Sequence, residues 1–165
     1  MAELNNREYY DKAKNTIEPA VCDAINKYLN SEQVVAYLPP VIMLPFSDGR
    51  LHDSIDYAGH TDIMVHSFRA TNRFGAGHFS VDVKTITPGN DRDINTNFSM
   101  SVQEIDGCNT PDYFAFVYHT TVHLVKSSVV KSLVTKKTSA KTGQQFYTFP
   151  LVEAMANSVF TTTLV

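Results

Sequence analysis

The sequence predicts an α/β or α+β fold, in which a small mixed β-sheet is flanked by helices. An amphipathic helical stripe lies near the N-terminus, apolar segments of period two fill the middle, and strand-like segments turn helical near the C-terminus. With 165 residues, of which 43% are hydrophobic, the chain can form one domain over residues 1–165 without disulfides. No apolar run approaches the roughly 18 residues of a membrane span, so no membrane partner is expected.

The first organised segment is an amphipathic helix. Its apolar residues recur at the spacing of one helical face: Ile17, Ala20, Val21, Ala24, Ile25, Tyr28 and Leu29. Thr16 is the expected N-cap, and Pro19 is tolerated only in the first turn. Cys22 falls within this pattern and reads as a small buried hydrophobe.

From Val34 the pattern becomes extended, because three prolines interrupt the apolar run up to Phe46. A turn is expected at Ser47-Asp48-Gly49. Strands are then predicted over residues 57–68 and 78–87, and residues 95–106 fit either a helix or a strand.

The last third of the chain alternates strands and helices. Residues 112–118 form a strong strand, and the segment after Val122 begins as a strand and turns helical at Ser127 or Ser128. Residues 134–145 are polar and read as a loop. A short strand and a helix beginning near Pro150 complete the chain.

Two of the middle strands carry the residues that point to chemistry. Alternation places Asp62 on one face of the first strand, with Asp82 and Lys84 on one face of the second. An antiparallel hairpin would bring the two aspartates together as oxygen ligands for a hard divalent cation. The carbonyl of Val83 could add a ligand, and Lys84 could orient or deprotonate a metal-bound water.

These residues resemble the PD-(D/E)XK nuclease superfamily, through Asp62 in TDIMV and Asp82-Val83-Lys84 in FSVDVKT. Thr61 stands where the family motif has proline. The resemblance implies a restriction-endonuclease-like core and a Mg²⁺-dependent endonuclease that hydrolyses DNA phosphodiester bonds, with Mn²⁺ able to substitute. It implies Asp62, Asp82 and Lys84 as catalytic residues, and Glu18 in the first helix as a further metal ligand. Cleavage of both strands then implies a homodimer or a higher homo-oligomer.

Other interpretations of the same residues remain open. Asp53 and Asp56 compete with Asp62 for the role of the first acid, although they precede the predicted strand. An Asp-x-Lys triplet also arises by chance on solvated strand faces. In that case the charged residues form surface ion pairs, and the chain is a non-catalytic nucleic-acid-binding or assembly protein.

The distribution of charge favours a polyanionic partner. The net charge is −3, which argues mildly against a protein that coats nucleic acid. From Tyr113 to Val152, however, there are five lysines and no Asp or Glu. Four of them are the expected DNA-phosphate contacts: Lys131, Lys136, Lys137 and Lys141.

The first residues and the cysteines indicate the cellular compartment in which the protein is expected. The first residues are polar and charged and do not form a secretory signal. The two cysteines have no CxxC spacing. We therefore expect a cytoplasmic protein.

Overall fold

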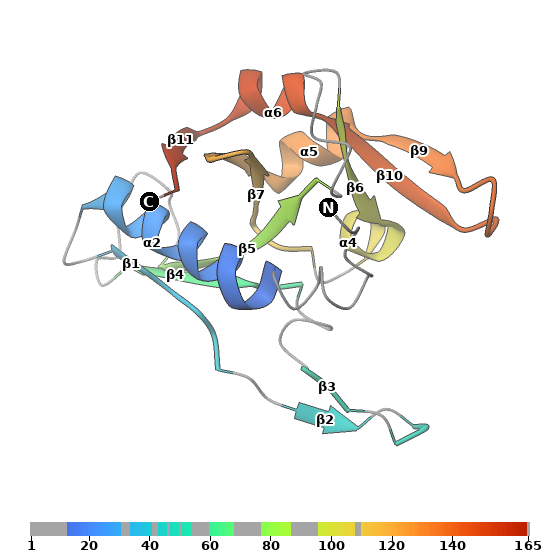
Figure 1. The fold of residues 1–165 in the computed structure, drawn as a ribbon, viewed down its shortest axis with the longest axis horizontal. Helices are drawn as coiled ribbons and strands as arrows, with labels where there is room; N and C mark the ends of the chain where they lie inside the picture. The colour runs from blue at the N-terminus through green and yellow to red at the C-terminus, as the bar shows by residue number, and fades with distance from the viewer. Residues whose placement is uncertain are drawn as a thin grey trace, which may run out of the picture.

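The computed structural model has the mixed α/β architecture that the sequence predicts, with a central sheet flanked by helices (Figure 1). The structure describes residues 13–30, 34–40, 43–45, 47–49, 51–53, 60–67, 77–86, 96–107 and 110–164. The predicted fold class is confirmed.

Six strands form the central sheet, in the order β1-β4-β5-β7-β8-β11. Their bounds are β1 (Val34–Tyr37), β4 (Ile63–Ser67), β5 (His78–Thr85), β7 (Tyr113–Tyr118), β8 (Thr121–Lys126) and β11 (Phe160–Thr163). Neighbours run antiparallel except for β5 and β7, which are parallel. A parallel pair requires a crossover connection, and here it contains β6 (Asn97–Ser101) and α4 (Val102–Asp106). Residues 95–106, whose sequence fits either a helix or a strand, therefore contain a strand followed by a short helix.

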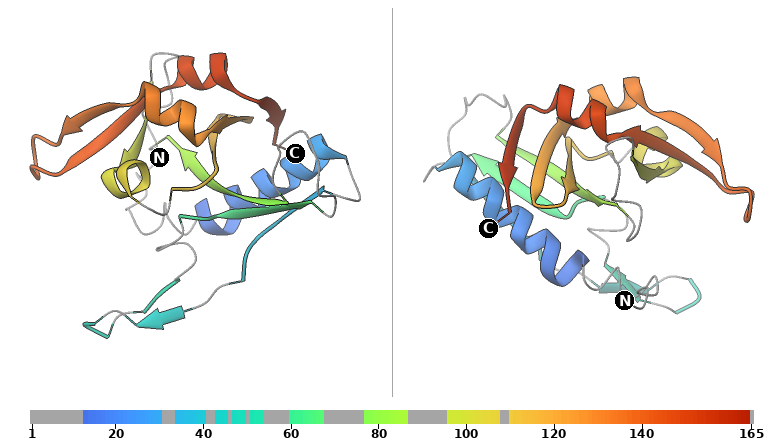
Figure 2. Two further views of the ribbon diagram at one scale, coloured as in Figure 1. Left: turned by 180° about the vertical axis from the view of Figure 1, so that it is seen from behind. Right: turned by 45° about the horizontal axis from the view of Figure 1, so that its top comes forward.

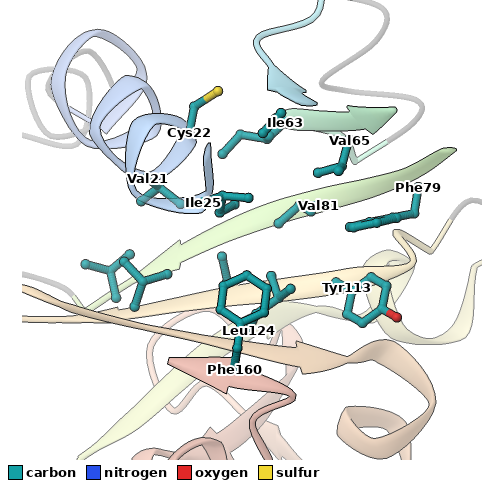
Figure 3. Close-up of a cluster of buried hydrophobic side chains, with 14 residues drawn as sticks. Val21, Cys22, Ile25, Ile63, Val65, Phe79, Val81, Tyr113, Leu124 and Phe160 are labelled. Carbon is teal, nitrogen blue, oxygen red and sulfur yellow. The ribbon is translucent and has the colours of Figure 1, made fainter. Parts of the chain in front are cut away.

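Helix α2 (Glu18–Leu29) packs against one face of this sheet through the predicted apolar stripe (Figure 3). Cys22 is buried there as a free thiol, and burial together with Asp23 raises its pKa to about 11. A π-helical turn, η1 (Ala13–Ile17), runs directly into α2. Thr16 lies inside that turn and Ile17 takes the capping position, so the predicted Thr16 cap is wrong. Pro19 lies in the first turn, as predicted.

The other face of the sheet meets a second layer. This layer contains α5 (Ser127–Leu133), α6 (Leu151–Asn157) and a three-stranded sheet of order β6-β10-β9, with β9 (Thr135–Thr138) and β10 (Gln145–Pro150). Strand β7 lies between the two cores: Ala115 and Val117 face α2, whereas Phe114 and Phe116 face the second layer. Burial on both faces explains the apolar sequence of β7.

Two hairpins extend from the body of the molecule in every view (Figures 1 and 2). One pairs β2 (Met43–Pro45) with β3 (Leu51–Asp53) and contains the predicted turn at residues 47–49. The other pairs β9 with β10. The loop predicted over residues 134–145 is therefore wrong. All four β9 residues are exposed, so this strand has no buried face and no apolar alternation to reveal it.

None of the helices in the described ranges has the length and hydrophobicity needed to cross a bilayer.

Candidate active site

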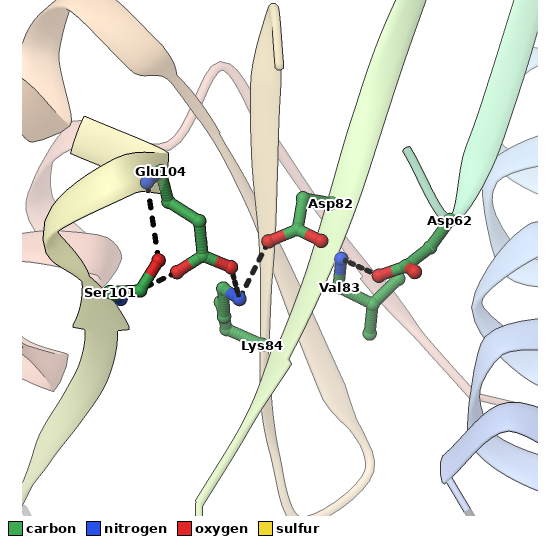
Figure 4. Close-up of polar contacts among 6 residues, drawn as sticks. All are labelled: Asp62, Asp82, Val83, Lys84, Ser101 and Glu104. Atoms are coloured by element: carbon green, nitrogen blue, oxygen red, sulfur yellow. Dashed lines mark hydrogen bonds and ion pairs between the residues drawn. The ribbon is translucent and has the colours of Figure 1, made fainter. Parts of the chain in front are cut away.

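The carboxyl groups of Asp62 and Asp82 are neighbours at the end of the β4–β5 ladder. The two strands pair antiparallel as predicted, with Ile63 opposite Val81. The N–H of Asp62 donates to the Val81 carbonyl at 3.0 Å, and Asp62 Oδ2 accepts from the Val83 N–H at 2.7 Å (Figure 4). Asp62 directly precedes β4, so its carboxyl bonds the β5 backbone at the point where the strand pairing ends.

Both carboxyl groups are removed from water, with Asp62 6% and Asp82 4% exposed. Burial raises the pKa of Asp62 well above its ordinary value, and the carboxylates of Asp82 and Glu18 raise it further. Burial also raises the pKa of Asp82, although the Lys84 ammonium opposes this effect. Neighbouring acids of this kind resist ionising together, and a bound cation would relieve their repulsion.

Lys84 lies between two carboxylates. Its Nζ is 2.7 Å from Asp82 Oδ2 and contacts Glu104 Oε1 on the other side (Figure 4). The contact with Asp82 is an ion pair without hydrogen-bond geometry, and Oδ2 has no hydrogen-bond partner within the described part of the chain. Burial lowers the pKa of Lys84, but the two carboxylates together raise it above its usual value. In the cation-free fold, Lys84 therefore holds its proton more tightly than a free lysine does.

Glu104 is not among the residues expected from the sequence. It lies on α4, is 8% exposed, and belongs to a capping box with Ser101. Ser101 Oγ accepts from the Glu104 N–H at 3.2 Å, and Glu104 Oε2 accepts from the Ser101 N–H at 2.7 Å. Burial raises the pKa of Glu104, but Lys84 and these bonds lower it overall. The Ser-x-x-Glu spacing is the sequence signal that could have identified this residue.

Oxygen donors for a cation gather beside Asp62. A residue in an extended strand directs its N–H and C=O to the same edge, so the Val83 carbonyl faces the side on which its N–H bonds Asp62. Half-buried Glu18 begins α2 and lies close enough to raise the pKa of Asp62. Among the residues that the structure describes, no three or more His, Cys, Asp or Glu side chains are arranged to hold a metal ion. Mg²⁺ commonly takes only one or two carboxylates, with waters and phosphate oxygens completing its shell. The two aspartates fit that mode, because Oδ2 of Asp82 has an ion pair with Lys84 but no hydrogen bond within the described part of the chain.

Within the described part of the chain, neither of the two acids that compete with Asp62 for the role of first acid is seen at this site. Asp53 ends β3 and pairs with Met43 in the separate two-stranded sheet. Asp56 is outside the described residues. Immediately before the site, His60 has a φ of 45° and lies close enough to Glu104 to lower its pKa. A left-handed backbone at a non-glycine residue is often found at functional sites.

The four predicted DNA-binding lysines are all exposed, and they are distributed over a helix, a strand and a turn. Lys131 lies on α5, Lys141 lies in the turn of the β9–β10 hairpin, and Lys136 and Lys137 are successive residues of β9. Successive strand residues point to opposite faces, so Lys136 and Lys137 are divided between the two faces of the hairpin. Lys136 lies over the Tyr147 ring and 3.9 Å from Asp106 of α4.

Comparison of the chain with protein-family models, with curated proteins and with solved structures found no match. The buried acids and Lys84 are therefore the best indication of what the chain does.

Proposed function

We propose that this chain is a metal-dependent endonuclease that hydrolyses phosphodiester bonds in DNA, of the PD-(D/E)XK type that Asp62 and Asp82-Val83-Lys84 resemble. The observation that carries the proposal is the meeting of two buried acids with the Lys84 ammonium at the end of one β-hairpin. Buried acids with raised pKa values cost stability. Their presence together is typical of a functional site, and it suits a divalent cation.

In this proposal, a bound cation and the side chains of the protein have different chemical roles. Held at Asp62 and Asp82, Mg²⁺ or Mn²⁺ would polarise the scissile phosphate and lower the pKa of a water molecule. Asp62 and Asp82 supply the negative charge that binds the ion. The Lys84 ammonium would orient the phosphate and stabilise the charge that develops there.

DNA as the substrate is supported by the run of exposed lysines between Tyr113 and Val152, where no acid occurs. Contacts of this kind position a duplex without reading its sequence. A chain with one site cuts one strand at a time. Cleavage of both strands therefore requires two copies, for which a two-fold homodimer is the simplest arrangement.

The test is cleavage of supercoiled, linear, single-stranded and branched DNA with Mg²⁺ or Mn²⁺. We expect the wild type to cleave at least one of them. Asp82→Asn should lower the rate by about 10²–10³-fold or more, as the loss of an electrostatic catalytic group does. Asp23→Asn removes an exposed acid of α2 and should leave the rate unchanged.

An Asp82→Asn variant that cleaves at the wild-type rate would contradict the proposed site. A wild type that binds DNA but neither cleaves it nor binds Mn²⁺ would favour the non-catalytic nucleic-acid-binding alternative.

A further inference from the structure

The ammonium of Lys84 occupies a place where it competes with a cation. Its Nζ is 2.7 Å from Asp82 Oδ2, the carboxylate oxygen that lacks a hydrogen bond. A divalent ion bound to this oxygen would stand within a few ångströms of the ammonium, and like charges at that distance repel strongly. Lys84 must therefore leave Asp82 when a cation binds there.

A lysine that leaves Asp82 still needs a partner. The Lys84 side chain is only 17% exposed, and an unpaired charge in such surroundings is costly. Glu104 Oε1 already contacts the ammonium from the side away from Asp82 (Figure 4). Lys84 can therefore shift from two carboxylates to one without losing its counter-charge.

Glu104 is held so that it can take this role. Its Oε2 accepts from the Ser101 N–H at 2.7 Å, and its own N–H donates to Ser101 Oγ. One carboxylate oxygen is thus fixed by the helix cap, and the other is directed at Lys84. Because the capping box ties Glu104 to the β6–α4 junction, the side chain need not move when Lys84 shifts.

We propose that Glu104 is a positioning residue that takes over Lys84 when a divalent cation binds Asp82, and thereby keeps the ammonium directed at the cation-bound phosphate. This inference rests on the proposed function, because the cation is part of it. Glu104 acts on the cation only through Lys84 and is not itself a ligand.

The experiment is calorimetric titration with Mn²⁺ of the wild type, Glu104→Gln, Lys84→Met and the double variant. Lys84→Met should bind Mn²⁺ more tightly than the wild type, because the competing ammonium is gone. Glu104→Gln should bind about tenfold or more weakly, within the range of typical coupling energies. In the Lys84→Met background, Glu104→Gln should lower Mn²⁺ affinity by less than about threefold. The effects of two substitutions are not additive when one residue acts through the other.

The matched control is Asp106→Asn, which removes a negative charge from the same helix without touching Lys84. It should change Mn²⁺ affinity by less than about threefold, because Asp106 is not coupled to Lys84. At saturating Mn²⁺, Glu104→Gln should also slow single-turnover cleavage while leaving the dissociation constant for DNA unchanged. If Glu104→Gln does not fold, Glu104→Asp, which keeps the charge on a shorter side chain, takes its place in both backgrounds.

Two results would overturn the inference. An equal loss of affinity in both backgrounds would make Glu104 a direct ligand, and no loss in the wild-type background would leave it a purely structural cap. A wild type that binds no Mn²⁺ would overturn the proposed function as well, so the two failures are distinguishable.

Discussion

Asp62 is a residue whose ionisation the fold makes unfavourable. Its carboxyl is buried beside Asp82 and Glu18, and its pKa is raised well above the ordinary value. The Val83 N–H bond lowers the pKa but does not offset burial. In the absence of a cation, the Asp62 carboxyl is therefore harder to ionise in the folded chain than in the unfolded chain.

We expect Asp62→Asn to stabilise the cation-free protein at neutral pH. A carboxyl with a raised folded pKa contributes its stability fully below its unfolded pKa, about 3.9, and loses it as pH rises through the folded pKa. Asn mimics the protonated acid and can still accept from the Val83 N–H. Each whole step in pKa is worth about 1.4 kcal/mol, and each kcal/mol moves Tm by about 2–4 °C in a chain of this size.

The measurement is thermal unfolding in chelator at pH 4 and pH 7. The gain of Asp62→Asn over the wild type should be present at pH 7 and close to zero at pH 4. Asp23→Asn, on the exposed side of α2, should show no such difference. Equal stability of wild type and Asp62→Asn at pH 7 would mean that Asp62 ionises in the fold at no cost.

At this scale, alternation within two strands was enough to place Asp62, Asp82 and Lys84 together, because neighbouring strands pair with a fixed side-chain period. Glu104 could not be placed in the same way. Its partner Lys84 lies 20 positions earlier, across the crossover, and no local pattern states which buried charges will meet.

Among the elements, the β9–β10 hairpin separates two lysines that are adjacent in the sequence. Lys136 pairs in register with Tyr147, whose hydroxyl donates to both carboxylate oxygens of Asp106 on α4. Lys136 therefore faces α4, the helix that carries Glu104. Lys137 lies opposite Phe146 on the other face.

We therefore expect the two lysines to differ in DNA binding. Lys136→Ala should weaken DNA affinity and lower the slope of log affinity against log salt by about 0.9, the value for one phosphate contact on duplex DNA. Lys137→Ala is the matched control, with the same charge change on the opposite face, and should leave the slope nearly unchanged. Fluorescence anisotropy over a range of salt concentrations measures both.

Equal losses of DNA affinity in the two variants would contradict this assignment of faces. They would indicate that both faces of the β9–β10 hairpin contact DNA. No loss in either would leave Lys136 with structural contacts alone, namely the exposed ion pair with Asp106, which has little energetic value, and the contact with the Tyr147 ring.

The helices and strands that could be predicted from the sequence are those that bury a face. The helical stripe of α2 and the apolar run of β7 were both readable, because each buries a face that selects residue types. Strand β9 was not, since Thr-Lys-Lys-Thr exposes every side chain and its strand character comes from pairing with β10.

For the whole molecule, the sequence predicted layers but not their connections. Helices and a mixed sheet follow from the order of periodic segments. The placement of β7 beside β5 rather than beside β6 depends on pairing between distant segments. The same crossover brings α4, and with it Glu104, to the acids of β4 and β5.

A cation that binds only the folded chain should stabilise the entire fold. At a Mn²⁺ concentration of 100 times its dissociation constant, linkage gives about 2.7 kcal/mol, or roughly 5–10 °C in Tm. Differential scanning fluorimetry with and without Mn²⁺ should show this rise for the wild type and little or none for Asp82→Asn. The same rise in both proteins would place the bound ion away from Asp82.

The full exposure of β9 also affects how the protein can evolve. A substitution on this strand removes no buried contact, so it costs little stability. The acids and Lys84 belong to other elements, whose burial restricts change. If the proposed function holds, mutation can therefore alter the surface that the β9–β10 hairpin offers to DNA while the buried site stays constant. A lineage carrying this fold would then diverge in its targets faster than in its reaction.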